Sequence, residues 1–167
     1  MTSVNYRLNY DVSKFEKYVK DYSEAYAQVG VLGNPKSKNG ETVVDYAIVH
    51  EFGSINHNIP RRSFIKDPLE KHLGDEIRTV EGTLKKLLTQ GNIDKAVAVL
   101  GMKAVEVIKK AFKTSNDGQW APLAESTIRN MKYSDPNRHK SWKILVDTGA
   151  LQSSITSQVV VTKGRGK

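Results

Sequence analysis

The sequence predicts an α+β fold in which a long antiparallel helical hairpin packs on a small, mostly antiparallel sheet, with short additional helices. Apolar residues recur every three or four positions across two long segments, which are joined by Gly91 and Asn92. Two shorter segments, one near each end of the chain, alternate or are rich in β-branched residues, as strands are. The 167 residues fit a single domain that spans residues 1–167.

The segment before the hairpin predicts two short helices with a strand between them. Ser13 and Glu16 have the spacing of a capping box, and aromatic residues follow at helical intervals, so we expect a helix over residues 13–23. Residues 25–32 alternate and end at Gly33, which predicts a strand. Thr42 can cap a second helix that ends at Gly53.

The hairpin is predicted from its two apolar stripes. Asp67 followed by Pro68 is typical of a helix start, and residues 63–66 can extend that helix backwards. We expect one long helix from there to near Gly91, and a second, capped by Asn92, to about Lys113. The stripes, interpreted as core, contain Leu69, Leu73, Ile77, Val80, Leu84 and Leu87 in the first helix and Ala96, Val97, Leu100, Ala104, Val107, Ile108 and Ala111 in the second.

The last third of the sequence has a less regular pattern. We expect a turn at residues 116–118, a short helix over 123–131, and a strand or a buried turn at 143–147. A single helical turn through Leu151 and a final strand over 155–162 follow. Polar composition predicts flexible loops at about 34–41 and 132–141 and a flexible C-terminal end at 163–167.

Composition and charge limit the classes of function. The chain has no cysteine, which excludes disulfides and thiolate chemistry, and a cytosolic origin fits. No apolar run approaches about 18 residues, and residues 1–10 lack the features of a signal peptide, so we expect no membrane contact. The formal net charge is +8, and the excess lies after residue 60. It indicates either contact with nucleic acid or an acidic protein, or simply a solvated surface.

Catalytic and metal-binding motifs are not found. His50 and Glu51 resemble the start of a zinc-protease motif, but Ser54 stands where the second histidine is required. His57 follows His50 by seven residues, whereas the zinc-protease motif places its second histidine four residues after the first. No nucleophile-elbow motif supports a serine triad, although a triad is spatial and a small hydrolase built around a histidine remains a third alternative. We therefore predict no catalytic residue, no metal and no cofactor.

Three short stretches together resemble a known family. They are Val-His-Glu-Phe-Gly at 49–53 followed by Ile-Pro-Arg-Arg-Ser-Phe-Ile at 59–65, Gly-Gln-Trp-Ala-Pro-Leu at 118–123 with Thr127 and Arg129 after it, and Ile-Leu-Val-Asp-Thr-Gly-Ala-Leu-Gln-Ser-Ser-Ile at 144–155. In this order they resemble the virion-morphogenesis proteins of Mu-type tailed phages, and more loosely the tail-completion proteins of long-tailed phages. The resemblance spans about residues 27–160. The family often has proline where this chain has Ser63.

The resemblance implies a structural protein of the phage neck, and no enzyme. It implies a ring, expected to be a hexamer, at the head–tail junction of the virion, assembled in the host cytoplasm. The implied partners are further copies of the chain, the neighbouring head-completion or connector and tail-tube proteins, and the DNA that passes through the lumen. The alternative, favoured by the net charge of +8, is a DNA-binding accessory protein of a phage or mobile element.

Four residues in these stretches are candidates for the interface between subunits. Pro60 stiffens the approach to Arg61 and Arg62, whose forked donors can grip carboxylates of a neighbouring subunit. The alternative for this pair is two solvated side chains. Phe64 belongs to the same stretch. Trp120 follows a glycine turn, so it either anchors a loop in a partner's pocket or covers the local core.

Overall fold

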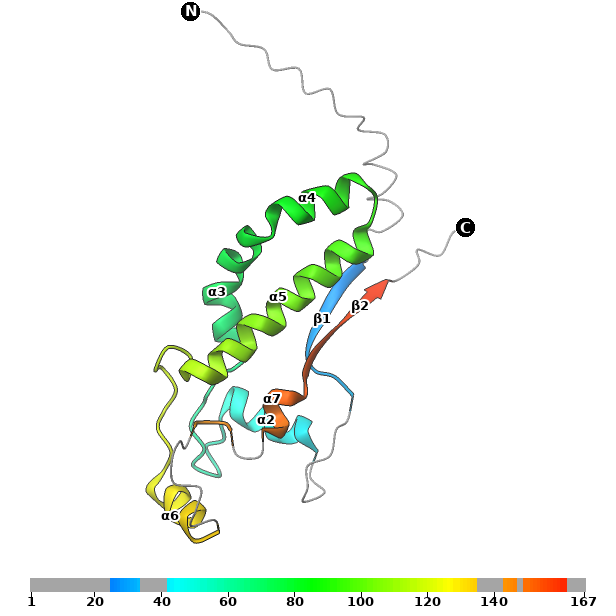
Figure 1. The fold of residues 1–167 in the computed structure, drawn as a ribbon. Coiled ribbons are helices and arrows are strands. Elements are labelled where there is room, and N and C mark those ends of the chain that lie inside the picture. The colour runs from blue at the N-terminus through cyan, green and yellow to red at the C-terminus, as the bar shows by residue number, and fades with distance from the viewer. Residues whose placement is uncertain (1–24, 34–41, 135–142, 147–148, 162–167) are drawn as a thin grey trace, which may run out of the picture.

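The structure is a computed structural model that describes residues 25–33, 42–134, 143–146 and 149–161. It confirms an α+β fold with a small two-stranded antiparallel sheet. The described elements, in chain order, are β1 (Ala25–Val31), α2 (Val43–Phe52), α3 (Lys66–Thr79), α4 (Glu81–Thr89), α5 (Ile93–Thr114), α6 (Glu125–Ser134), α7 (Ala150–Ser153) and β2 (Ile155–Val161), as Figure 1 shows. Within the described part of the chain, no helix has the length and apolarity to cross a membrane.

The sheet joins two segments that lie far apart in the sequence. Its register pairs Ala25 with Val161 at one end and Val31 with Ile155 at the other. Both strands were predicted, and both begin where their residue pattern begins. Val29 and Val31 pack against the core that buries Ile155, whereas Gln28 and Gln158 are exposed and bond to each other at 3.0 Å. One face of the sheet is thus covered and the other faces solvent.

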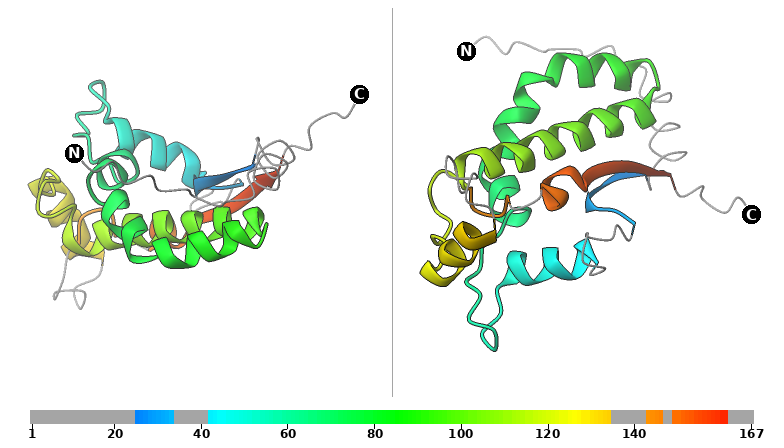
Figure 2. Two further views of the ribbon diagram at one scale, coloured as in Figure 1. Left: turned by 90° about the horizontal axis from the view of Figure 1, so that it is seen from above. Right: turned by 60° about the horizontal axis from the view of Figure 1, so that its bottom comes forward.

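Helix α5 is the central element of the fold. It packs against the sheet on one side and against α3 and α4 on the other, and Figures 1 and 2 show it between them. This position explains why its burial runs along its length, from Ala96 to Phe112. Its buried residues are Ala96, Gly101, Ala104, Val107, Ile108, Ala111 and Phe112.

The prediction of one continuous first helix is wrong at Val80. The helix ends at Thr79 and a new one starts at Glu81, because Val80 has φ −113° and ψ 7°. Two β-branched residues, Thr79 and Val80, are followed closely by Gly82, and all three weaken a helix. The bend lets α3 and α4 each follow α5 (Figure 1). Leu84 and Leu100, predicted to be core, are only half-buried.

The core gathers below α5 around aromatic side chains. Phe64, Phe112 and Trp120 form a chain of ring contacts, with centroids 5.4 and 5.6 Å apart. Leu145 closes this cluster from a turn at residues 144–145, which decides between the predicted strand and the predicted buried turn. Leu151 of the short helix α7 completes it, as the expected helical turn at that position.

Other predicted boundaries compare as follows. Helix α2 matches its prediction at both ends, with Thr42 as the cap and Gly53, at φ 78°, as the terminator. Helix α6 runs to Ser134, so residues 132–134 are helical although a loop was predicted there. The predicted helix at 13–23, the loop at 34–41 and the C-terminal end at 163–167 lie outside the described residues.

Gly101 lets α5 approach the sheet closely. A Cβ atom at this position would lie 3.1 Å from the Cβ and Oγ of Ser157 and 3.2 Å from the Cβ of Ala27. These atoms are fixed to the two strands, so a larger side chain would push the helix off the sheet. We expect Gly101→Leu to lower the free energy of unfolding by about 1–3 kcal/mol in urea titrations.

The matched control is Gly74→Leu in α3. No atom lies within 4 Å of the position that its Cβ would take, and the residue is exposed. Leucine is a better helix former than glycine, so this variant should be as stable as the wild type or more stable, by up to about 1 kcal/mol. Equal effects at positions 101 and 74 would contradict the close approach.

Candidate functional site

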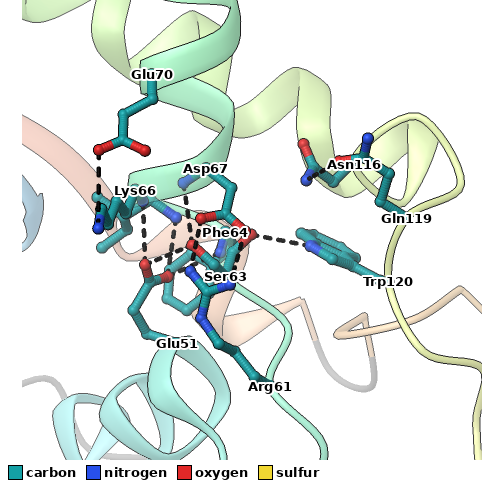
Figure 3. A network of polar contacts seen from close by, with 11 residues as sticks. Glu51, Arg61, Ser63, Phe64, Lys66, Asp67, Glu70, Asn116, Gln119 and Trp120 are labelled. Carbon is teal, nitrogen blue, oxygen red and sulfur yellow. Dashed lines mark hydrogen bonds and ion pairs between the residues drawn. The ribbon is translucent and has the colours of Figure 1, made fainter.

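The carboxylate of Glu51 joins the end of α2 to the start of α3. Its two oxygens accept four hydrogen bonds: from Ser63 Oγ at 2.7 Å and from the backbone N–H groups of residues 64, 65 and 66 at 2.8, 3.0 and 3.0 Å. Figure 3 shows them converging on the one side chain. These N–H groups lie immediately before and at the start of α3, which begins at Lys66, and a helix start leaves its donors unsatisfied and favours negative charge. Glu51 is 7% exposed. It therefore caps α3 from another helix.

Ser63 and Asp67 complete the start of α3, and they correct the predicted cap. Asp67 was expected to cap the helix, but it lies inside the first turn, and its own N–H donates to Ser63 Oγ at 3.0 Å. The carboxylate of Asp67 instead receives two hydrogen bonds from Arg61, at 2.9 and 2.6 Å. This forked ion pair lowers the pKa of Asp67 and raises that of Arg61. It lies at the surface.

Arg62 and Trp120 hold the segment after α5 against the start of α3. Arg62 donates from Nε to the carbonyl of Ala121 at 2.8 Å and from Nη2 to the carbonyl of Pro122 at 2.7 Å. Trp120 donates from Nε1 to the carbonyl of Ser63 at 2.9 Å. Arg62 and Trp120 are each only 6% exposed. The interpretation of Trp120 as a cover of the local core is therefore confirmed.

The four candidate interface residues thus have different surroundings. Phe64 has no exposed surface, and Arg62 is buried within the chain, so the alternative of a solvated arginine pair is wrong for one of its two members. Arg61 alone among the four is exposed, with 48% of its side chain accessible. Sequence reasoning missed Glu51 as the residue that organises the site. The available signal was an acidic residue two positions before a helix-ending glycine, shortly before a second helix start.

The loop between α2 and α3 forms a short projecting arm, defined here as residues 52–60. Ser54 and Ile59 pair in an isolated antiparallel bridge, with N···O distances of 2.8 and 2.9 Å. Between them, Ser54 Oγ and His57 Nδ1 lie 3.0 Å apart. Residues of the arm, together with Arg61, line an open hollow of about 770 Å³. Figure 2 shows the arm extending beyond the body of the molecule.

His50 is buried directly behind this arm. Its ring meets that of Tyr46 edge-on, with centroids 4.3 Å apart, and its Nδ1 atom has no hydrogen-bond partner in the described part of the chain. Burial first, and the positive charge of Arg62 second, lower the pKa of His50 from 6.5 to about 4. The imidazole is therefore neutral at pH 7 and is packed as a core residue.

The described residues hold no group of three His, Cys, Asp or Glu side chains that could bind a metal ion. His50 and Glu51 are adjacent in sequence but act separately, since Glu51 is fully engaged with α3. His72 lies 2.9 Å from Asp117, which also accepts from Lys71 at 2.7 Å, and this surface cluster joins α3 to the turn after α5. Comparison with known proteins gives no match to a family model, to a curated protein or to a solved structure.

Loss of the Glu51 carboxylate should destabilise the whole chain. In Glu51→Ala, three backbone N–H groups and one hydroxyl lose their buried acceptor. A hydrogen bond to a charged group contributes about 1.5–3 kcal/mol to stability. We expect the free energy of unfolding in urea to fall by at least about 2 kcal/mol. The control is Glu70→Ala in α3, where Glu70 makes an exposed contact of 3.8 Å with Lys66. That variant should stay within about 0.5 kcal/mol of the wild type.

His50 should make stability depend on pH. The unfolded chain binds a proton at His50 near pH 6.5, whereas the folded chain binds it only near pH 4, so the free energy of unfolding falls as the pH drops through this window. The contribution of this residue is at most about 3 kcal/mol. His50→Leu removes it, so the difference in stability between pH 7 and pH 4.5 should be smaller than in the wild type. Tyr46→Phe, which keeps the neighbouring ring, should retain the wild-type dependence.

Proposed function

We propose that this chain is a structural subunit of the neck of a tailed bacteriophage, a tail-completion or head–tail joining component. The observation that supports the proposal is the convergence of the three stretches that carry the resemblance. Residues 49–65, 118–123, 144–146 and 149–155 belong to stretches that lie far apart in the sequence, yet they meet in one packed unit. Glu51, Phe64, Trp120, Leu145 and Leu151 are its buried members.

The way these stretches use their polar groups also fits a structural role. The carboxylate of Glu51, the guanidinium of Arg62 and the indole N–H of Trp120 all bond to groups within the chain. Such groups fix backbone segments relative to one another. The unit they form presents the arm at one end of the molecule, where a neighbouring protein can reach it (Figure 2).

In this proposal the chain assembles with further copies of itself into a ring, hexameric in the virion, between the connector and the tail tube. DNA passes through the lumen. The helices α3 and α4, folded back on α5, then form the helical hairpin of the subunit. Strands β1 and β2 form its small sheet. No reaction and no cofactor belong to this function.

A DNA-binding accessory protein is the second candidate, and one observation favours it. Lys95, Lys109 and Lys113 recur at helical spacing on α5, and in the described residues none has a carboxylate within 4.0 Å. Most other lysines and arginines of the described residues are paired with acids. An unpaired row of lysines along one helix is what a phosphate backbone attracts. A salt-dependent affinity for duplex DNA would be expected from this candidate alone.

The deciding experiment removes the gene from the phage that carries it. We expect lysates to contain filled heads and finished tails that are not joined, and a plasmid copy of the wild-type chain to restore joined particles. Mass spectrometry of purified particles should detect the chain at a few copies per virion. Normal joining without the gene, or a chain absent from purified virions, would contradict the proposal.

A further inference from the structure

The arm carries the two most exposed large apolar side chains in the described part of the molecule. Ile55 is 95% exposed and Phe52 is 71% exposed, and both line the same hollow. Ile48, one helical turn before Phe52 on α2, is 52% exposed. A single exposed isoleucine is ordinary, but neighbouring ones at the tip of a projecting loop indicate a contact surface.

The arm is held rigidly from its base to its tip. Gly53 donates to the carbonyl of Val49 at 2.8 Å, and a Cβ atom on Gly53 would lie 2.9 Å from the backbone N of Arg61, so the two legs of the arm touch. Arg61 in turn forms an ion pair with Asp67 of α3 through two hydrogen bonds. A surface fixed in this way loses little conformational entropy when it docks.

At the opposite end of the molecule, the described residues include large apolar side chains that the rest of the described chain does not fully cover. There the turn between α4 and α5 lies beside the start of β1 and the end of β2, in both Figure 1 and Figure 2. Tyr26, Leu88 and Val161 are 52%, 43% and 41% exposed at this end. The large apolar residues beneath them, among them Leu87 and Val97, are half-buried. We call this surface the open end.

We propose that the arm of one copy docks on the open end of the next copy, in a head-to-tail contact. The two surfaces lie at opposite ends of one chain, so neither can cover the other within it. Pairing of two arms would leave both open ends exposed, whereas the head-to-tail contact covers a surface of each kind. Repeated contacts of this type close into a ring or extend as a filament.

Charge favours a second copy over a nucleic acid as the occupant. Residues 52–60 contain no Asp, Glu, Lys or Arg, although the chain as a whole carries a net charge of +8. Copies of such a chain repel each other over most of their surface, and a neutral segment is where they can meet without placing like charges together. A phosphate backbone would require cations that the arm lacks. This inference deepens the proposed function by naming the surface through which its copies meet, and it rests on that function only for closure into a ring.

Site-directed crosslinking tests the geometry, because the chain has no native cysteine. Two differently tagged variants, Ile55→Cys and Leu88→Cys, are purified, mixed and treated with a short bis-maleimide. We expect mixed dimers to dominate the products. Met102→Cys replaces Leu88→Cys in the control, since Met102 is 60% exposed on α5. Crosslinks only between two Ile55→Cys chains, or mixed dimers equally frequent with Met102→Cys, would overturn the proposal.

Sedimentation equilibrium tests whether the arm supplies the affinity. Replacement of both Phe52 and Ile55 by serine should weaken self-association by about tenfold or more, as for exposed anchors of an interface, while circular dichroism stays that of the wild type. Met102→Ser should have no effect. A wild-type chain that stays monomeric up to about 1 mM would overturn the docking. Binding of such a monomer to lipid vesicles through Ile55 would also overturn it.

The outcomes separate this inference from the proposed function. Association through the arm by a chain that is absent from purified virions would refute the neck function and leave the docking intact. A virion protein that never associates through the arm would refute the docking alone.

Discussion

The capping of α3 by the carboxylate of Glu51 is the interaction on which the rest of the structure depends. Four donors converge on this one buried side chain, which ties the last turn of α2 to the first turn of α3. The chain between these two turns has to leave and return within a short distance, so it folds into the arm. Ser63, held by the same carboxylate, offers its carbonyl to Trp120 and thereby fixes the segment that follows α5. One side chain thus sets the positions of three elements.

The polar side chains around this capping contact are held in place by hydrogen bonds or by burial. A histidine, a glutamate and an arginine lie close together at positions 50, 51 and 62, respectively. This combination is found in many active sites. Here the glutamate is saturated by donors, the arginine is bound to carbonyls, and burial keeps the histidine neutral. Within the described residues, the side chains that remain accessible include large apolar ones, such as Phe52 and Ile55, and lysines of α5 with no carboxylate within 4.0 Å.

The sequence predicted the elements whose signals are local. Both strands follow from alternation and β-branched residues, and α2 follows from Thr42 and Gly53, which satisfy its two ends directly. The break at Val80 was missed because the apolar stripe continues through it, and only the weak helix propensity of its neighbours marks it. The site was predicted less well. The burial of Arg62 depends on carbonyls 59 and 60 residues away, and the role of Glu51 depends on a helix start 15 residues later. A single sequence contains no periodic pattern that would reveal contacts between residues at these separations.

The way Arg62 is bonded has a consequence for how this protein can diverge among relatives. Its guanidinium contacts the main-chain oxygens of Ala121 and Pro122 and no side-chain atom of either residue. Substitutions at those two positions would keep both acceptors in place as long as the backbone path is preserved. The arginine itself has no equivalent substitute, because lysine lacks the planar fork that spans two carbonyls. This contact therefore places a stricter requirement on the arginine than on the side chains at positions 121 and 122.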